Sequence, residues 1–266
     1  MKQTLNFFIL TFVVYFTFGV LQVKANNKIF IMLNVDNTII DRIDKCDINQ
    51  MNFLNTQGIK TQRLEFIASN HTSSKFMGIY KQIVKGQTYF NGESNYLSKV
   101  IVHKKHNDIF QITECIAIRP ITRDLLEKLN NLKKPVKILL TSRNDDARTE
   151  NLHKNLDLTI QGNKFNNITT YIPRDRFRIK IITPEGKEIS AKSSIELRKH
   201  YSSISSNDYV ILLDHIEDSR FIKYDDSKDL NIVVSKYTIN EEYDILHDQQ
   251  EVMKIIDKIK DFTENN

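Results

Sequence analysis

Two patterns in the sequence predict an α/β fold built on a mostly parallel sheet. The first is a set of short, almost wholly apolar runs at residues 28–33, 136–140, 209–213 and 230–237. The second is helical spacing of apolar residues between and after them, as in "ITRDLLEKLNNL" and "DQQEVMKIIDKIKDF". Strands without polar alternation are buried on both faces, which is typical of parallel sheets covered by crossover helices. We therefore expect a Rossmann-like three-layer sheet with helices on both faces and an inserted, cap-like α+β module.

The first half of this core has clear boundaries. The strand at 28–33 runs directly into "NVDNT", residues 34–38. After Pro120, helical spacing predicts a helix over 121–132, for which Thr122 is a plausible N-cap. Pro135 ends that helix, and the strand at 136–140 follows. A second helix is expected over "DDARTENLHKNL", 145–156.

The second half begins with an alternating segment, 171–190, which turns at "PEG" and predicts a hairpin. "AKSSIELRKHY", 191–201, is expected to form a helix before the strand at 209–213. The strand at 230–237 and a closing amphipathic helix over 248–262 complete the core.

Residues 42–115 have a mixed pattern. "RLEFIAS", 63–69, and "KVIVHKK", 99–105, alternate like strands, while "NGES" between them is typical of a turn. We interpret 42–115 as the inserted cap-like module, α+β or β-rich. The core of the protein would then comprise 26–41 and 116–266.

The first 25 residues have the three parts of a secretory signal peptide. Lys2 provides the basic start, Phe7 to Leu21 is an apolar run, and Val23 and Ala25 fit a cleavage site. The run is shorter than the roughly 20 residues that a membrane-spanning helix prefers. We expect 1–25 to be removed and the protein to be exported, to the periplasm, the surface or the medium. The alternative is an uncleaved membrane anchor at 7–21.

Export would permit a disulfide between the two cysteines, Cys46 and Cys115. Two free, buried thiols are equally compatible with the sequence.

The charge balance suits anionic partners without indicating nucleic acid. The net charge is +5, and loss of Lys2 and Lys24 would lower it by 2 to +3. There is no Trp, and no basic block interleaved with aromatics stands out, so no nucleic-acid partner is expected. G-x-S-x-G, Walker A, H-E-x-x-H and Cys/His zinc spacings do not occur.

Polar residues gather where the apolar strands end. In parallel sheets of this kind ligands bind at the carboxyl ends of the strands. This rule selects three groups of residues: Asn34, Asp36 and Thr38; Thr141 and Ser142; Asp214, Glu217 and Asp218.

Neighbouring carboxylates repel one another unless a cation lies between them, and oxygen ligands of this kind suit Mg²⁺. A hydroxyl group and Lys192, near the start of the expected helix over 191–201, would complete a cradle for a phosphoryl group. Each residue also has a simpler interpretation. An Asp after a strand is most often a turn or cap residue, Thr141 and Ser142 a helix cap, and Lys192 a solvated side chain.

Four motifs in this order resemble those of the haloacid dehalogenase-like (HAD) hydrolases. The first HAD motif is an apolar strand followed by Asp-x-Asp-x-Thr, and "IMLNVDNTII" matches it at the strand, at Asp36, at Thr38 and at the apolar pair that follows. "KILLTSR" resembles the second motif through Thr141. "IRPITRDLLEKLNNLKKPVKILLTS" resembles the approach to that motif in the branch with the CTD-type phosphatases.

Lys192 fits the third motif, and "YVILLDHIEDS" resembles the fourth through Asp214 and Asp218. The resemblance covers 28–41 and 116–237 and leaves 42–115 unexplained, where many HAD proteins have a cap.

The resemblance implies Mg²⁺-dependent phosphoryl transfer through an aspartyl-phosphate. Asn34 occupies the nucleophile position, and Asp36 would be the general acid and base. Phosphate ligands would be Thr38, Thr141, Ser142 and Lys192, and metal ligands Asp36, Asp214 and Asp218. The partner would be a phosphorylated small molecule or protein.

Asn34 departs from this pattern, because a carboxamide is a far poorer nucleophile than a carboxylate and brings no charge to a metal. Mg²⁺ binding would then be weak or absent. Three interpretations follow: a pseudoenzyme that binds a phosphorylated ligand or partner, an enzyme in which Asp36 or Asp214 activates water, or a sequence variant with Asp changed to Asn. His215 replaces the second acid of a common fourth motif, as a ligand or as a structural residue.

Overall fold

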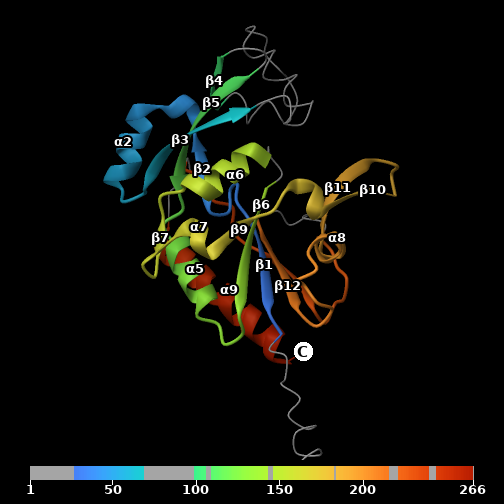
Figure 1. Cartoon of the computed structure of the whole chain (residues 1–266). Helices are drawn as coiled ribbons and strands as arrows, with labels where there is room; N and C mark the ends of the chain where they lie inside the picture. The colour runs from blue at the N-terminus through green and yellow to red at the C-terminus, as the bar shows by residue number, and fades with distance from the viewer. Residues whose placement is uncertain are drawn as a thin grey trace, which may run out of the picture.

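A five-stranded parallel sheet forms the centre of the molecule (Figure 1). The computed structural model describes residues 27–68, 99–105, 109–142, 146–182, 184–215, 221–239 and 244–265. The sheet strands are β1 (Ile29–Asn34), β6 (Val136–Thr141), β9 (Thr169–Tyr171), β12 (Tyr209–Asp214) and β14 (Asp229–Val233). They lie in the order β14-β12-β1-β6-β9, and all four pairings are parallel. The predicted Rossmann-like α/β class is confirmed.

The central strand β1 is buried on both faces, as its uninterrupted apolar sequence predicts. Ile29, Ile31 and Leu33 point into one core, where they meet α5 (Thr122–Asn130) and α9 (Ile245–Asn265). Phe30 and Met32 point into a second core, completed by α8 (Ser194–His200). Helices therefore cover both faces of the sheet.

The first core also contains the short elements between β6 and β9. These are α6 (Asp146–Asn155), the ribbon of β7 (Thr159–Ile160) and β8 (Asn163–Lys164), and α7 (Phe165–Ile168). Leu152 of α6 and Phe165 of α7 have 0% exposure there.

A second, antiparallel sheet lies beyond the carboxyl ends of the parallel strands (Figure 1). It contains β2 (Ile40–Ile43), β3 (Thr61–Ala68), β4 (Ile101–Lys104) and β5 (Phe110–Ile118). β5 pairs with each of the other three. The one-turn helix η1 (Asp44–Cys46) and α2 (Ile48–Thr56) connect β2 to β3. We call β2 to β5 the inserted sheet. It extends across both predicted module boundaries, and the division at 42 and 115 stays a prediction.

A third sheet flanks the core and contains the predicted hairpin. After the one-turn helix η2 (Arg174–Arg176), β10 (Arg178–Ile182) pairs antiparallel with β11 (Glu188–Ser193). The short strand β13 (Phe221–Ile222) joins β11 in parallel. Gly186 in the hairpin turn has φ of 75°, a left-handed conformation that glycine adopts without steric cost.

Three sequence expectations differ from the structure. Thr122 is not the N-cap of α5, because Ile121 occupies that position and the Thr122 hydroxyl donates to the carbonyl oxygen of Ile39. The expected helix over 191–201 begins only at Ser194, because the preceding residues pair with β10 and β13. The strand expected over 230–237 ends at Val233. The "NGES" turn lies outside the described residues.

Cys46 and Cys115 form a disulfide that joins η1 to β5, with their Cα atoms 5.0 Å apart. Of the two possibilities left by the sequence, the structure therefore has the bonded pair. Lys45 and Cys46 both have left-handed backbones, with φ of 43° and 55°. Such conformations cost about 1–3 kcal/mol per non-glycine residue, so the cross-link holds a strained turn in place.

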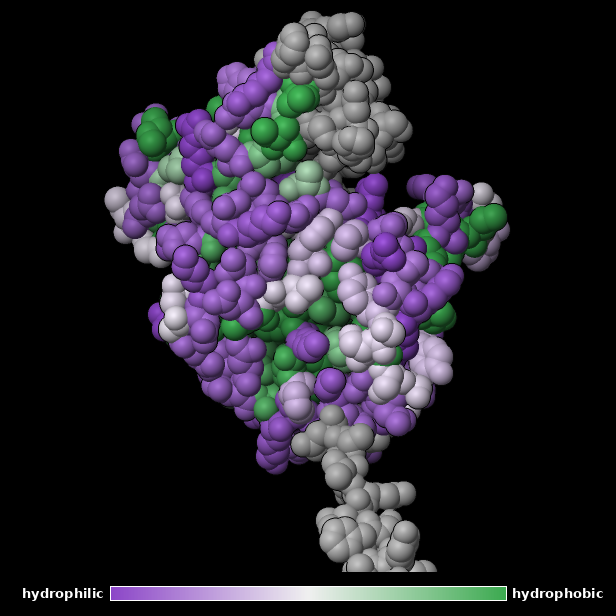
Figure 2. Space-filling view, viewed as in Figure 1, coloured by the Kyte–Doolittle hydropathy of each residue, from purple (hydrophilic) through white to green (hydrophobic). Residues whose placement is uncertain are grey.

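The face in Figure 2 is mostly hydrophilic, with hydrophobic areas over α2, over the β10–β11 hairpin and in the middle of the face. Phe53 of α2 is 62% exposed and Ile182 of the hairpin 76%. None of the described helices has the length and apolar character needed to cross a bilayer. The signal-peptide and anchor interpretations concern residues outside the described part and stay predictions.

Candidate functional site

Three neighbouring strands end at the same level of the parallel sheet. Asn34 of β1 is in register with Thr141 of β6, and Leu33 with Leu213 of β12, so Asp214 lies beside Asn34. All three side-chain positions are buried: Asn34 is 3% exposed, and Thr141 and Asp214 are 0% exposed. The structure thus brings together Asn34, Thr141 and Asp214, three of the residues that the strand-end rule selected.

Lys192 reaches this point from the third sheet. Its ammonium group lies 3.1 Å from Oδ1 of Asn34, 3.3 Å from Oγ1 of Thr141 and 3.0 Å from Oδ2 of Asp214. Lys192 is 2% exposed, so it is no solvated surface residue. It comes from strand β11 rather than from the start of a helix, because it pairs with Arg178 and Phe221.

The carboxamide of Asn34 is oriented by its neighbours. Oδ1 accepts from Lys192, whose ammonium group can only donate. Nδ2 donates to the backbone oxygen of Asp36 at 2.8 Å and to Oγ1 of Thr38 at 3.2 Å. The turn after β1 therefore uses a hydrogen-bond donor at position 34, which a carboxylate cannot supply.

His215 completes the cluster of Asn34, Thr38, Thr141, Lys192 and Asp214, which we call the inner group. Its Nδ1 lies 3.3 Å from Nδ2 of Asn34, from Oγ1 of Thr38 and from Oδ1 of Asp214. The imidazole thus stands where it touches both the amide and the acid of the site. Glu217 and Asp218, which follow it, lie outside the described residues.

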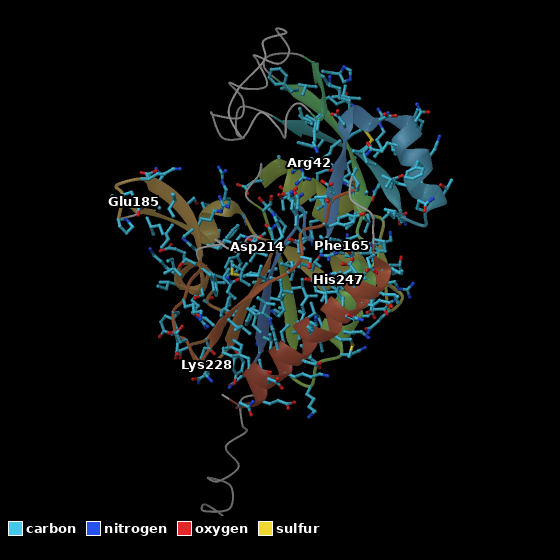
Figure 3. All side chains as sticks on the ribbon, turned by 180° about the vertical axis from the view of Figure 1, so that it is seen from behind. Arg42, Phe165, Glu185, Asp214, Lys228 and His247 are labelled. Atoms are coloured by element: carbon cyan, nitrogen blue, oxygen red, sulfur yellow. A yellow bond between two sulfur atoms is a disulfide. The ribbon has the colours of Figure 1, made fainter. Side chains whose placement is uncertain are left out.

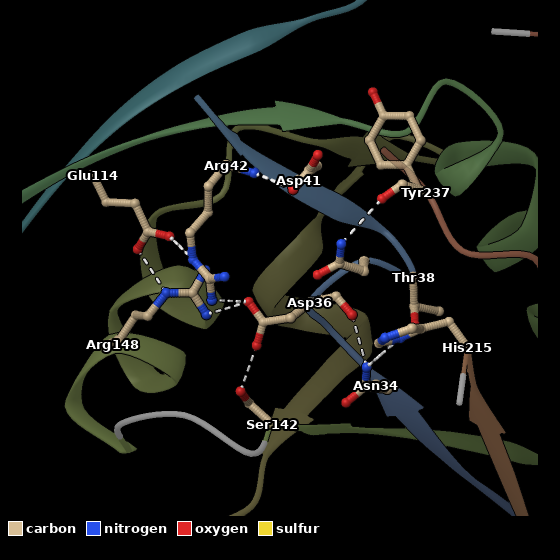
Figure 4. A network of polar contacts seen from close by, with 11 residues as sticks. Asn34, Asp36, Thr38, Asp41, Arg42, Glu114, Ser142, Arg148, His215 and Tyr237 are labelled. Carbon is tan, nitrogen blue, oxygen red and sulfur yellow. Dashed lines mark hydrogen bonds and ion pairs between the residues drawn. The ribbon is translucent and has the colours of Figure 1, made fainter. Parts of the chain in front are cut away.

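Asp36 points away from this inner group. Figure 4 shows its carboxylate directed toward Arg42, Arg148 and Ser142. Oδ1 lies 2.5 Å from Arg42 and 2.8 Å from Arg148, and Oδ2 accepts from the Ser142 hydroxyl at 2.7 Å. The predicted acid/base residue is thus bound by two guanidinium groups, and the Ser142 hydroxyl faces Asp36. Their predicted catalytic, metal-binding and phosphate-binding roles stay predictions.

Sequence reasoning did not find Arg42, Glu114 or Arg148. The guanidinium of Arg148 lies 2.6 Å from Glu114, and that of Arg42 lies 3.0 Å from it. One signal was available: Glu114 lies in the middle of β5, directly before the apolar run 115–118, and a buried acid requires a cationic partner. Figure 3 shows Arg42, in β2 of the inserted sheet, above Asp214 at the end of β12.

Arg119 fixes the backbone on the other side of the site. Its guanidinium donates to the carbonyl oxygens of Thr38 at 3.1 Å and Ser235 at 3.0 Å, and it forms ion pairs with Asp248 and Glu251 of α9. Burial opposes the charge, but the hydrogen bonds and charges of the two acids raise the pKa of Arg119 overall.

The segment after β14 closes over the turn that bears Asn37. Backbone N–H of Tyr237 donates to the carbonyl oxygen of Asn37 at 2.7 Å, and Nδ2 of Asn37 donates back at 3.4 Å. Asn37 itself is left-handed, with φ of 56°. Burial, followed by the charge of Asp41, raises the pKa of the Tyr237 phenol, so it stays neutral.

The described residues contain no group of three or more His, Cys, Asp or Glu side chains arranged to hold a metal. In the inner group the charge of Asp214 is already matched by Lys192. The site therefore has no excess negative charge in the described part.

Comparison with known proteins adds little. No family model and no curated protein sequence matches the chain. Among solved structures, the chain is similar to the fission yeast RNA polymerase II CTD phosphatase Fcp1 bound to beryllium fluoride. The identity is 13% and the TM-score 0.32, and the alignment covers 94% of this chain and 57% of that one. The chain thus spans little more than half of that structure's length.

Proposed function

We propose that this chain is an exported HAD-type pseudoenzyme, a module that binds a phosphorylated ligand or partner without forming an aspartyl-phosphate. The observation that supports it most is the environment of Asn34. Its amide is held by Lys192 on one side and by the backbone of Asp36 on the other. The position that the HAD resemblance assigns to the nucleophile is thereby built around an uncharged group.

The HAD assignment is supported by the order and placement of the four motifs. Asn34, Thr141 and Asp214 follow adjacent parallel strands, and Lys192 reaches all three. A buried lysine beside hydroxyl groups is a suitable donor set for phosphoryl oxygens. We assign phosphate binding to Lys192, Thr141 and Thr38. Ser142 lies on the other side of Asp36, where its hydroxyl donates to the Asp36 carboxylate.

The absence of a carboxylate nucleophile removes the covalent route. An amide oxygen attacks phosphorus far more slowly than a carboxylate. Of the two acids that could activate water, Asp36 has its negative charge stabilised by Arg42 and Arg148, and Asp214 lies 3.0 Å from the Lys192 ammonium group. Both features favour binding over turnover.

Mg²⁺, which the HAD resemblance implies, does not fit the inner group as it stands. Mg²⁺ prefers carboxylate oxygens in octahedral geometry. Asp214 is the carboxylate of the described inner group, and the Lys192 ammonium lies 3.0 Å from it. We therefore assign no step to a metal.

Export is supported by the signal-peptide pattern of residues 1–25 and by the disulfide between Cys46 and Cys115. Disulfides persist mainly in oxidising compartments.

Calorimetric titration with inorganic phosphate, and an aryl phosphate assay with Mg²⁺, test the proposal together. We expect the wild-type protein to bind phosphate without turnover. Lys192→Met should abolish binding, whereas Lys199→Met, at a side chain 68% exposed, should not change it. Turnover by the wild type that Asp36→Ala removes would overturn the proposal and support direct activation of water.

A further inference from the structure

Four charged side chains form a closed ring next to the candidate site. Asp36 contacts Arg42 and Arg148, and Glu114 contacts the same two arginines. Each guanidinium therefore bridges both carboxylates, and the ring of Asp36, Arg42, Glu114 and Arg148 has no net charge. Figure 4 shows all four side chains facing one another. We call this group the charge ring.

The charge ring joins two parts of the fold. Asp36 follows β1, and Arg148 belongs to α6, both in the core around the parallel sheet. Arg42 and Glu114 belong to β2 and β5 of the inserted sheet. Every contact between Asp36 and Arg42, and between Arg148 and Glu114, thus crosses from the core to the inserted sheet.

The ring is shielded from water. The side chains of Arg148 and Glu114 are 1% exposed, and those of Arg42 and Asp36 are 12% exposed. A buried charge left without its partner is strongly destabilising, whereas neutral replacement of a whole pair is tolerated. The free energy of the ring therefore depends on keeping its charges balanced.

Asp36 also connects the charge ring to the inner group. Its backbone oxygen accepts the amide proton of Asn34, and its Oδ2 accepts from Ser142 at the end of β6. Displacement of the Asp36 carboxylate from the arginines would therefore move the turn that orients Asn34 and Thr38.

We infer that Asp36 is a positioning residue, which acts through Arg42 and Arg148 to hold the inserted sheet against the site. This rests on the proposed phosphate-binding function and deepens it. The acid that the HAD resemblance assigns to proton transfer has here become part of a structural ion-pair ring. Binding of phosphate at the inner group is thereby coupled to the position of the inserted sheet.

The test compares two single variants with a charge-balanced double variant. Asp36→Asn and Arg42→Met each leave one uncompensated charge, and each should lower the melting temperature and weaken phosphate binding by about tenfold. Hydrogen exchange at the amides of β2 and β5 should accelerate in both. The double variant Asp36→Asn/Arg42→Met is again neutral and keeps the buried Arg148–Glu114 pair between the core and the inserted sheet. It should therefore recover exchange protection and bind phosphate within about threefold of the wild type. If a single variant fails to fold while the double variant folds, this result also supports the inference.

Arg63→Met is the matched control, because Arg63 lies in the same sheet in a pair that is 59% and 47% exposed. It should change neither exchange nor affinity. A double variant that regains stability but binds phosphate as weakly as Asp36→Asn would overturn the inference, because Asp36 would then contact the ligand itself. A wild type that binds no phosphate would instead refute the proposed function, while the exchange measurements still decide whether the ring holds the inserted sheet.

Discussion

The side-chain amide of Asn34 donates to the backbone carbonyl oxygen of Asp36, across 2.8 Å. This contact closes the turn after the central strand. It also determines how replacement of Asn34 by Asp changes the stability of the fold.

Asn34→Asp should destabilise the protein by about 1–3 kcal/mol at pH 7, because a hydrogen bond is lost and two oxygen atoms are left facing each other. Urea unfolding measures the change. Asn52→Asp, at an exposed position of α2, is the control and should have little effect. An Asn34→Asp protein as stable as the wild type would show that the amide is dispensable.

Mg²⁺ should distinguish the same two proteins. In the wild type Lys192 balances Asp214, so we expect no rise in melting temperature with MgCl₂ beyond that with NaCl of equal ionic strength. Asn34→Asp adds a carboxylate next to Asp214, and the melting temperature of this variant should rise with Mg²⁺. Stabilisation of the wild type by Mg²⁺ would contradict this charge balance.

Loss of the disulfide should destabilise the protein substantially. The chain-entropy argument gives about 4 kcal/mol for a cross-link over a loop of 69 residues. The Cys46→Ser/Cys115→Ser variant should therefore unfold at lower urea than the oxidised wild type. Reduced wild type should match the double variant. Equal urea unfolding midpoints for the oxidised and the reduced protein would show that the disulfide does not stabilise the fold.

Removal of Arg119 should be among the most costly single changes. Its guanidinium is 3% exposed and pairs with Asp248 and Glu251, so Arg119→Met leaves two acids unpaired and should cost about 3–5 kcal/mol. Arg123→Met breaks a pair on the surface instead and should cost far less. Chemical denaturation of both variants gives the comparison. Similar losses of unfolding free energy in the two variants would mean that burial of the Arg119 ion pairs contributes little to stability.

Acid should destabilise the fold partly through Asp208. Burial alone would raise its pKa, but hydrogen bonds from the backbone of Lys28 and from the backbone and hydroxyl of Ser205 lower the pKa overall. A lowered pKa in the folded state means that this stabilisation is present above the ordinary Asp pKa of about 3.9 and is lost as the pH falls through the folded value. Asp208→Asn should therefore be less stable than the wild type at pH 6, with the difference shrinking below pH 4. A pH-independent difference would exclude this carboxylate as the cause.

The sequence predicted the parallel core well because burial on both faces leaves a direct trace in composition. β1 and β12 are apolar up to their last residues, Asn34 and Asp214, and the helical spacing of α5 and α9 could be read without a structure. Strand-end chemistry then placed Asn34, Thr141 and Asp214 together. The α2 helix escaped notice because it has few buried residues, with Leu54 the buried one, and so little amphipathic pattern.

The orientation of side chains could not be predicted. Asp36 matches the family motif in sequence, yet its carboxylate faces Arg42 and Arg148, which come from segments 6 and 112 residues further along the chain. Lys192 was expected on a helix and lies on a strand, because pairing with β10 outweighed a local helical pattern. Contacts between distant segments decide such details, and no local pattern records them.

The pairing of β2 with β5 sets Ile40 opposite Ile118 and Asp41 opposite Ala117. The chain therefore leaves the core and returns to it through adjacent positions of one ladder. An insertion whose two ends lie side by side can be lengthened, shortened or exchanged without altering the course of the central strands. Evolution, or a protein engineer, could thus graft a different specificity element onto this core at the Ile40–Ile118 junction.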